Sequence, residues 1–199
     1  MQDTKKAIME SAMRLFSQRG IYQTSLKDIA EETSVSKGTI FYHFPTKDEL
    51  LYEIMDYGFS DALDKLFMAS IETDKLGDKK FIFSQCLEIL RDDKLLFPIN
   101  IHLLEVALCG NEVIFEKMHE KYCQWRKMFY NLIVSNYADE ELKLDEEVID
   151  AQASIILALI DGLHVQHMVS PEHFNVEELS KQAATAINAM VSLEVSQPK

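Results

Sequence analysis

The sequence predicts an all-α protein of about nine helices. Three observations support this class. Apolar residues recur at helical spacing along most of the chain, beginning with Ile8, Ala12, Leu15 and Phe16. The 199 residues include only 6 glycines and 4 prolines, so long uninterrupted elements are expected. Strand-like alternation does not persist in any segment, and no internal repeat or sustained heptad pattern is evident.

The first fifty residues predict three short helices and the start of a fourth. The first contains the apolar face that begins at Ile8. The second begins near Leu26, and the third covers about 37–43. The fourth opens with the capping-box pattern T-x-x-E and extends to about residue 70. The residues expected to begin or end these helices are Gly20, Ser25 with Asp28, Ser36, Pro45 and Thr46 with Glu49.

The rest of the chain predicts further helices joined by short polar segments. Pro98 suits the first turn of one helix, and Pro171 suits a single helical turn. Asn175 with Glu178 resembles a capped start of the last helix. The expected ranges are about 79–91, 98–110, 112–137, 146–168 and 175–194.

Charge is distributed unevenly along the chain. Residues 1–50 hold seven bases and seven acids, whereas the remaining 13 bases and 26 acids give residues 51–199 the whole net charge of −13. This asymmetry suggests two parts with different partners, because phosphates would repel only the acidic part. A merely solvated acidic surface is the alternative.

The composition also limits the cellular setting. The N-terminus lacks the apolar stretch of a secretory signal, and no run of apolar residues is expected to span a bilayer, so a soluble cytoplasmic protein is expected. Cys86, Cys109 and Cys123 have no metal-like spacing and are expected to be buried, reduced thiols. A redox sensor is the minor alternative.

The second and third helices have the spacing of a helix-turn-helix inside a three-helix core. Four apolar residues are expected to face inward and to hold the second helix across the third: Ile29, Ala30, Val35 and Ile40. Polar residues then remain on the outer side of the third helix, as a reader of the DNA major groove requires.

The stretch "LKDIAEETSVSKGTIFYHFPTKDELL", residues 26–51, resembles the signature of the TetR family of bacterial transcription regulators. The positions that match are Ile29, Ala30, Val35, Ser36, Gly38, Thr39, His43, Phe44, Lys47 and Leu50. The preceding "AMRLFSQRGIYQTSLKDIA" is also similar, so the resemblance covers about residues 5–55. "ALIDGLHVQHMVSPEHF", residues 158–174, is similar to a weaker pattern late in the family's second domain, and about 75–145 match in helical character alone.

The resemblance implies roles for eight residues. Lys37 and Thr39 are expected to read bases, with Gly38 allowing close approach to the DNA, while the others are expected to contact phosphates. The eight are Thr24, Ser25, Lys37, Gly38, Thr39, Tyr42, His43 and Lys47. Ser34 replaces the family's turn glycine, Thr33 replaces the small residue before it, and Phe41 replaces a common tyrosine. Phe41 is expected to pack in the core.

The resemblance further implies an effector pocket and a two-fold dimer in the second domain. Candidate pocket residues are Leu63, Phe67, Cys86, Leu90, His102, Glu105, Trp125, Met128, Phe129, Ile160 and His164. Candidate dimer residues are Ile156, Leu163, His167, Leu179, Ala183, Ala186, Ile187 and Met190. Plain core packing is the alternative for both sets. A metal site at Asp161, His164 and His167 is disfavoured, because their spacing fits one helix face only loosely.

These features predict a DNA-binding domain at 1–46 and an effector-binding and dimerisation domain at 47–199. The expected function is a dimeric repressor that binds a palindromic DNA operator and is released by a small, apolar or amphipathic effector, with no cofactor and no metal. A protein-interaction module of the same fold is one alternative. An enzyme that uses His102 and Glu105 as an acid/base pair is another, although the chain lacks the common catalytic motifs.

Overall fold

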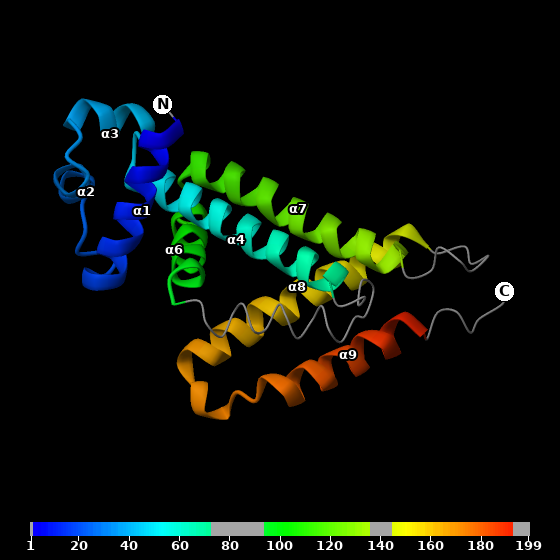
Figure 1. Cartoon of the computed structure of the whole chain (residues 1–199). Helices are drawn as coiled ribbons and strands as arrows, with labels where there is room; N and C mark the ends of the chain where they lie inside the picture. The colour runs from blue at the N-terminus through cyan, green and yellow to red at the C-terminus, as the bar shows by residue number, and fades with distance from the viewer. Residues whose placement is uncertain (1, 73–93, 136–144, 193–199) are drawn as a thin grey trace. The chain divides into compact units, whose positions relative to one another are not determined.

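The computed structural model describes residues 2–72, 94–135 and 145–192, and within these ranges every regular element is helical. The elements, labelled in Figure 1, are α1 (Gln2–Arg19), α2 (Leu26–Glu32), α3 (Lys37–His43), α4 (Lys47–Glu72), α6 (Leu96–Leu108), α7 (Glu112–Ser135), α8 (Glu146–Val169), the 3-10 turn η1 (Pro171–His173) and α9 (Val176–Ser192). The predicted all-α class is therefore confirmed. The helix expected at about 79–91 lies outside the described residues.

The chain divides into two compact units. The first contains residues 1–62 and 93–119, and the second contains 63–92 and 120–199. The helices α4 and α7 each contribute residues to both units. The functional boundary expected after residue 46 falls inside the first unit and stays a prediction.

In the first unit, α1, α2 and α3 form a compact head. Figure 1 shows α2 nearly end-on while α3 runs across the view, so the two helices cross steeply. Ile8, Ile29 and Ile40 are fully buried where these helices meet, and Phe44 closes the same core. Burial of each such side chain stabilises the folded state by roughly 1.5–3 kcal/mol. Because this burial requires α2 and α3 to cross at the observed angle, it holds the two helices in that arrangement.

The predicted helix starts are confirmed in their hydrogen bonds. Ser25 and Asp28 form a reciprocal capping box at α2, and the Thr39 N–H donates to Ser36 Oγ at 3.0 Å to begin α3. The Glu49 N–H donates to Thr46 Oγ1 at 3.1 Å, and the Glu178 N–H donates to Asn175 Oδ1 at 3.0 Å. These contacts span only three residues, which is why the sequence alone predicts them.

Gly58 lies in the middle of α4 where α6 packs closely against it. A Cβ added at Gly58 would stand 2.6 Å from the side-chain methyls of Leu96. A glycine inside a helix lowers stability by roughly 1 kcal/mol relative to alanine. The close approach of Leu96 explains why α4 nevertheless has a glycine at this position.

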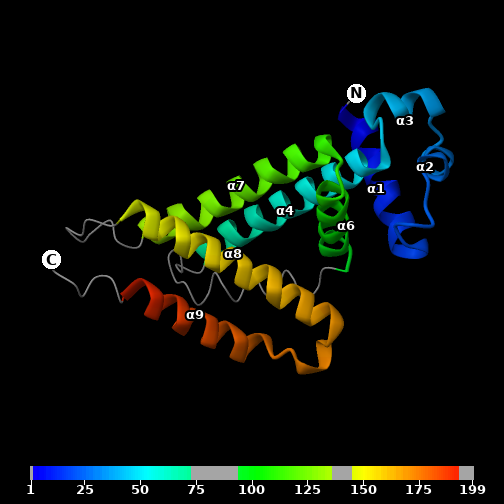
Figure 2. The ribbon, with the colours of Figure 1, turned by 180° about the vertical axis from the view of Figure 1, so that it is seen from behind.

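In the second unit, α8 and α9 run antiparallel and side by side, as the opposite views in Figures 1 and 2 agree. Their shared core includes Phe129 and Ile133 of α7, five residues of α8, and Ala183 of α9. Four residues predicted to face a second subunit belong to this internal core or pack against it: Ile156, Leu163, Leu179 and Ala183. The chain's own helices cover Ile156, Leu163 and Ala183, so the prediction that these three face a second subunit is wrong, whereas Leu179 is only partly buried and its place in a dimer interface stays a prediction.

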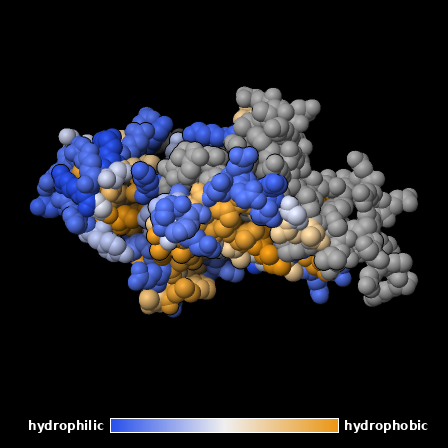
Figure 3. Space-filling view, turned by 90° about the horizontal axis from the view of Figure 1, so that it is seen from below, coloured by the Kyte–Doolittle hydropathy of each residue, from blue (hydrophilic) through white to orange (hydrophobic). Residues whose placement is uncertain are grey.

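The surface carries a number of exposed apolar side chains. Hydrophilic and hydrophobic residues both reach the face seen in Figure 3. Contrary to expectation, α8 is long and apolar enough to cross a membrane by length and composition. That is weak evidence for a membrane span, because core helices also pass this test.

The thiol of Cys109 is exposed rather than buried, Cys123 is partly buried, and Cys86 lies outside the described residues.

Candidate DNA-binding surface

The outer face of α3 presents the residues predicted to meet DNA. Ile40 and Phe44 hold one face of the helix in the core, so the opposite face is turned to solvent. Lys37 and Gly38 are exposed in the first turn of α3, and Tyr42 is 70% exposed one turn later. The outer face of α3 therefore offers a cation and a bare backbone in its first turn and a phenol one turn later.

The exposed position of Gly38 is not required by the packing of this chain. A Cβ placed there would meet one atom within 4 Å, Ser36 Oγ at 3.6 Å, which is ordinary contact. The backbone of Gly38 also lies outside the positive φ region that favours glycine. The missing side chain thus leaves room on the outside of the helix, where another molecule's backbone or base edge can approach.

About half of the bases on the head are paired with carboxylates, whereas Lys37 at the start of α3 and Arg19 at the end of α1 form no ion pair among the described residues. Four of its bases form ion pairs: Lys5–Glu53 at 2.6 Å, Lys6–Glu10 at 4.0 Å, Arg14–Glu32 at 3.6 Å and Lys27–Glu31 at 3.7 Å. Within the part of the chain that the structure describes, no carboxylate forms an ion pair with Lys37. The Lys37 ammonium is therefore available to an external anion at the edge of the surface.

Two of the predicted phosphate contacts have internal roles. Thr24 is only 1% exposed, and its hydroxyl donates to the Gly20 carbonyl at 3.0 Å. Because this side chain is inside the head, the prediction that it contacts a phosphate is wrong. Lys47 is partly buried, and its ammonium donates to the Ile21 carbonyl at 2.5 Å. Burial lowers the pKa of the Lys47 amine. Its two other protons remain for a further acceptor.

The other predicted contacts lie at the surface with their hydroxyls or rings partly engaged. Ser25 is exposed, and its hydroxyl hydrogen-bonds to the Asp28 carboxylate, which holds the pKa of that carboxyl below its usual value. Thr39 is partly buried, and its hydroxyl lies 2.8 Å from that of Ser36. The ring of His43 stands edge-on to Tyr42 at 5.2 Å. The Ser36 hydroxyl, which caps α3, therefore also fixes the orientation of the Thr39 hydroxyl.

Phe41 belongs to the same surface, and the expectation that it packs in the core is wrong. Its side chain is 52% exposed, because one residue further along α3 it is turned about 100° away from the buried Ile40. An apolar ring on a groove-reading helix suits contact with a thymine methyl group. The helical period could have placed Phe41 outside, since it directly follows the buried Ile40.

The turn between α2 and α3 is a Schellman motif with serine where glycine is usual. The Val35 N–H donates to the Ala30 carbonyl at 3.1 Å, and the Ser34 N–H donates to the Glu31 carbonyl at 3.2 Å. Ser34 takes the left-handed conformation with φ of 56°. The serine that replaces the family's turn glycine is therefore strained, at a cost of roughly 1–2 kcal/mol for an L-residue. The same motif ends α6, where Gly110 occupies the equivalent place with φ of 105°.

Ser34→Gly is expected to stabilise the protein by about 1 kcal/mol, because glycine adopts positive φ without a Cβ clash. The reverse exchange, Gly110→Ser, is expected to destabilise it by a similar amount, since no atom lies within 4 Å of a Cβ there and only the backbone is strained. Urea unfolding followed by circular dichroism measures both. Equal stability of the Ser34→Gly variant and the wild type would contradict the assignment of strain.

The residues predicted to line an effector pocket lie in different surroundings, and their role stays a prediction. His102 lies between two residues of its own unit, with Nε2 3.2 Å from Asp48 Oδ1 and Nδ1 3.3 Å from the Tyr22 hydroxyl. Glu105 is exposed, so it does not pair with His102 as an acid/base couple would. In the second unit, Phe129 and Ile160 are core and Met128 packs on them. The remaining positions divide into partly buried Leu63 and Trp125, buried His164, and Phe67, Cys86 and Leu90, whose side chains lie outside the described residues.

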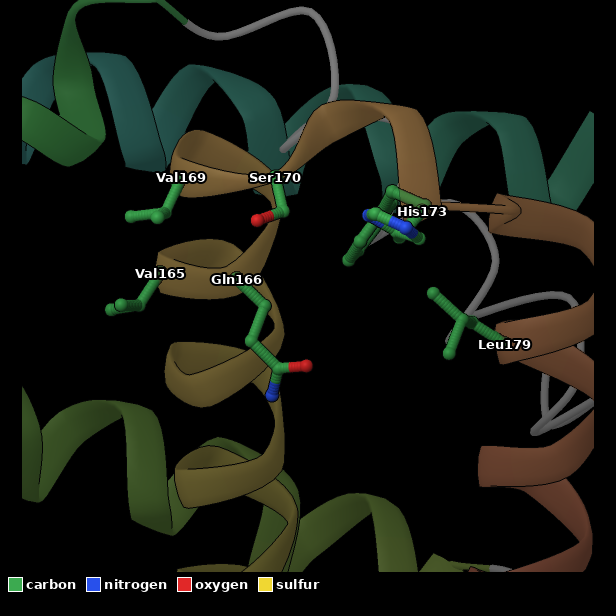
Figure 4. Close-up of a pocket in the computed structure, with 7 residues that line it drawn as sticks. Val165, Gln166, Val169, Ser170, His173 and Leu179 are labelled. Atoms are coloured by element: carbon green, nitrogen blue, oxygen red, sulfur yellow. The ribbon is translucent and has the colours of Figure 1, made fainter.

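A hollow of about 430 Å³ lies at the corner between α8, η1 and α9. Its lining consists of Val165, Gln166, Val169, Ser170, His173, Phe174 and Leu179. Figure 4 shows Leu179 and Gln166 pointing into the space, while Val165 and Val169 point to the other side of α8. Of the predicted pocket residues none lines this hollow, and of the predicted dimer residues Leu179 does.

Comparison with known proteins gives the same outline. Residues 8–54 match the family model of bacterial regulatory proteins of the tetR family, and residues 108–192 match that of the BetI-type transcriptional repressor, C-terminal. The chain is 40% identical over 183 residues to the "Probable HTH-type transcriptional regulator ArpR" of Pseudomonas putida, covering 86% of this chain and 83% of that one. It is 26% identical to the HTH-type transcriptional regulator AcrR of Shigella flexneri, covering 96% and 91%.

Solved structures show the same fold at lower identity. A transcriptional regulator from Saccharomonospora viridis in complex with choline superposes with a TM-score of 0.68 at 22% identity, covering 94% of this chain and 97% of that one. The fatty acid degradation regulator FadR from Bacillus halodurans superposes with a TM-score of 0.69 at 18% identity, covering 92% and 94%.

Proposed function

Because the chain belongs to the TetR family of bacterial transcriptional regulators, we propose that it binds a palindromic DNA operator as a dimer and is released by a small-molecule effector. The observation that carries the DNA-binding part is the outer face of α3, where Lys37, Gly38 and Tyr42 are exposed together. The relatives' names support transcriptional regulation rather than enzymatic activity. A cytoplasmic location is part of the same proposal.

We assign the α3 residues two kinds of contact. Lys37 and Thr39 read base edges in the major groove, with Phe41 as an added apolar contact. Tyr42, His43, Ser25 and Lys47 hydrogen-bond to phosphates and fix the register without reading sequence. The Ser25 hydroxyl already donates to Asp28, and the Lys47 ammonium already donates to the Ile21 carbonyl. We therefore expect these two residues to contribute less to the free energy of DNA binding than Tyr42 and His43.

The dimer face is proposed on the outer side of α8 rather than on the side predicted from sequence. Six exposed or partly exposed residues there follow the three-and-four spacing of a packing seam: Ala151, Ile155, Ala158, Gly162, Val165 and Val169. No atom of the chain lies within 4 Å of a Cβ added at Gly162. A glycine in mid-helix costs about 1 kcal/mol, and close approach of a second helix would offset that cost. Ala186 on α9 is exposed and His167 partly buried, while the side chains of Ile187 and Met190 lie outside the described residues.

Release by an effector requires that the effector prefer a conformer unable to bind both half-sites. The helix α4 supplies residues to both units and begins at Lys47, which hydrogen-bonds to the turn before α2. A change in α4 would therefore reach the head directly. The structure of a relative in complex with choline supports the idea that this fold accommodates a small molecule.

Operator binding by this surface is tested with duplexes selected from a random library and titrated by fluorescence anisotropy. The wild type is expected to bind with a steep salt dependence, because each phosphate contact releases counterions. Lys37→Ala is expected to lose about 1–3 kcal/mol of binding free energy and to relax the sequence preference, whereas Tyr42→Ala weakens binding to all sequences alike.

Lys127→Ala is the matched control, because it removes an exposed lysine of α7 and the same unit of charge. If it weakens binding as much as Lys37→Ala does, the effect is one of net charge and the assigned surface is wrong. A wild type that enriches no duplex would favour the alternative of a protein-interaction module with this fold.

A further inference from the structure

Between α7 and α8, a carboxylate lies beside two aromatic rings. Asp161 of α8 is partly buried, and the Tyr122 hydroxyl donates to its Oδ2 at 3.1 Å. The ring of Trp125 stands edge-on to that of Tyr122, with the ring centroids 5.1 Å apart and an interplanar angle of 67°. Tyr122 and Trp125 are three residues apart on α7, so they lie on the same face of that helix.

The negative charge of Asp161 has little compensation inside the chain. Among the described residues, Tyr122 alone hydrogen-bonds to this carboxylate, and no basic side chain forms an ion pair with it. Arg126, one turn further along α7, lies instead 3.8 Å from Asp150. Burial raises the pKa of the Asp161 carboxyl, and the Tyr122 hydrogen bond opposes that shift. A partly buried carboxylate in this setting is stabilised by any cation that reaches it.

The rings beside the carboxylate determine which cation fits. The faces of aromatic rings attract alkylated ammonium groups, whose positive charge is spread over apolar alkyl groups. A hard metal ion would need several oxygen ligands, and among the described residues no three acidic, histidine or cysteine side chains gather to hold one. His164, one turn along α8, is held neutral by burial, so it does not supply a competing charge.

We propose that Asp161, Tyr122 and Trp125 bind an organic cation, with the carboxylate facing the charge and the rings packing on its alkyl groups. This inference rests on the proposed function, because it names the chemical class of the effector. It also specifies the amphipathic effector expected from sequence as a positively charged one.

The chain itself supplies the reporter for the test, because Trp125 is its only tryptophan. Benzyltrimethylammonium is titrated into the full-length protein while Trp125 fluorescence is recorded. We expect a saturable change, with binding about tenfold or more weaker for the uncharged isostere in which carbon replaces nitrogen. Asp161→Asn is expected to weaken binding of the cation by a similar factor and to leave that of the isostere unchanged. Tyr122→Phe keeps the ring and loses less.

Asp150→Asn is the matched control, since it neutralises an exposed carboxylate on the same helix. Equal cation affinity of Asp161→Asn and wild type, or a wild type that does not distinguish the cation from its isostere, overturns the inference. Operator anisotropy is measured on the same samples. A cation that binds without weakening the operator complex also overturns the effector assignment. If the operator is bound and the cation is not, this inference alone fails, whereas absence of operator binding contradicts the proposed function.

Discussion

His164→Gln is expected to make the protein markedly more resistant to acid. His164 is 4% exposed, and burial with the nearby His167 lowers its pKa from 6.5 to about 3. Between these two values the unfolded chain binds a proton that the folded chain does not, so stability falls as the pH drops below 6.5. The loss is at most about 1.4 kcal/mol per pH unit, and it is absent above pH 6.5, where both states are neutral.

Urea unfolding at pH 7.5, 6.5, 5.5 and 4.5 measures the effect, with one point above the ordinary histidine pKa of about 6.5, one at it, and two between it and the lowered value of about 3. The wild-type free energy of unfolding is expected to decline steeply across the acid points, and that of His164→Gln to decline less. His173→Gln is the control, because the His173 side chain is 81% exposed and its replacement removes a histidine without removing a buried one. Parallel curves for wild type and His164→Gln would show that burial of His164 does not limit acid stability.

Ile155→Asp is expected to dissociate the proposed dimer and to abolish tight operator binding. Ile155 is the second residue of the outer seam of α8, and its large side chain is 48% exposed in the single chain. Placing an unpaired carboxylate in a packed seam costs on the order of 2–4 kcal/mol of association free energy. Because a single short helix reads few bases, a monomer that engages one half-site loses much of the affinity. Sedimentation equilibrium measures the association, and anisotropy measures the operator affinity.

Met168→Asp separates this effect from a general loss of apolar surface. Met168 is also 48% exposed on α8, but it lies about a quarter turn away from the seam. It is expected to leave both the dimer and operator binding unchanged. If Met168→Asp dissociates the protein and Ile155→Asp does not, the dimer face lies on another side of α8.

Much of the DNA-binding head was predictable from the sequence because its determinants are local. Ser25, Ser36 and Thr46 each act on a backbone N–H three residues later, so their spacing already contains the hydrogen bond. Even the strain at Ser34 could be anticipated, since a Schellman turn requires positive φ at that place whatever residue occupies it. Thr24 was misplaced for the opposite reason. Its hydroxyl turns back to the Gly20 carbonyl, and a position before a helix start does not reveal which way a side chain turns.

The second unit was harder to predict because α8 is apolar on more than one side. Ile156 and Leu163 face the core, while Ile155 and Val165 face out, and both pairs fit a helical period. The sequence pattern therefore allows either face to be internal, and it also makes α8 resemble a membrane span. Only the packing of α7 and α9 against one face decides between them.

By itself, the sequence determined the all-α class, the bounds of most helices, the caps of the head and the family. These depend on periodicity and on contacts within a few residues of chain. The tertiary structure decided which side of α8 is exposed in the single chain, that Gly58 lies against the Leu96 side chain, and that Asp161 accepts a hydrogen bond from Tyr122, 39 residues earlier. Contacts of that separation leave no spacing rule in the sequence, because they exist only once the helices have packed.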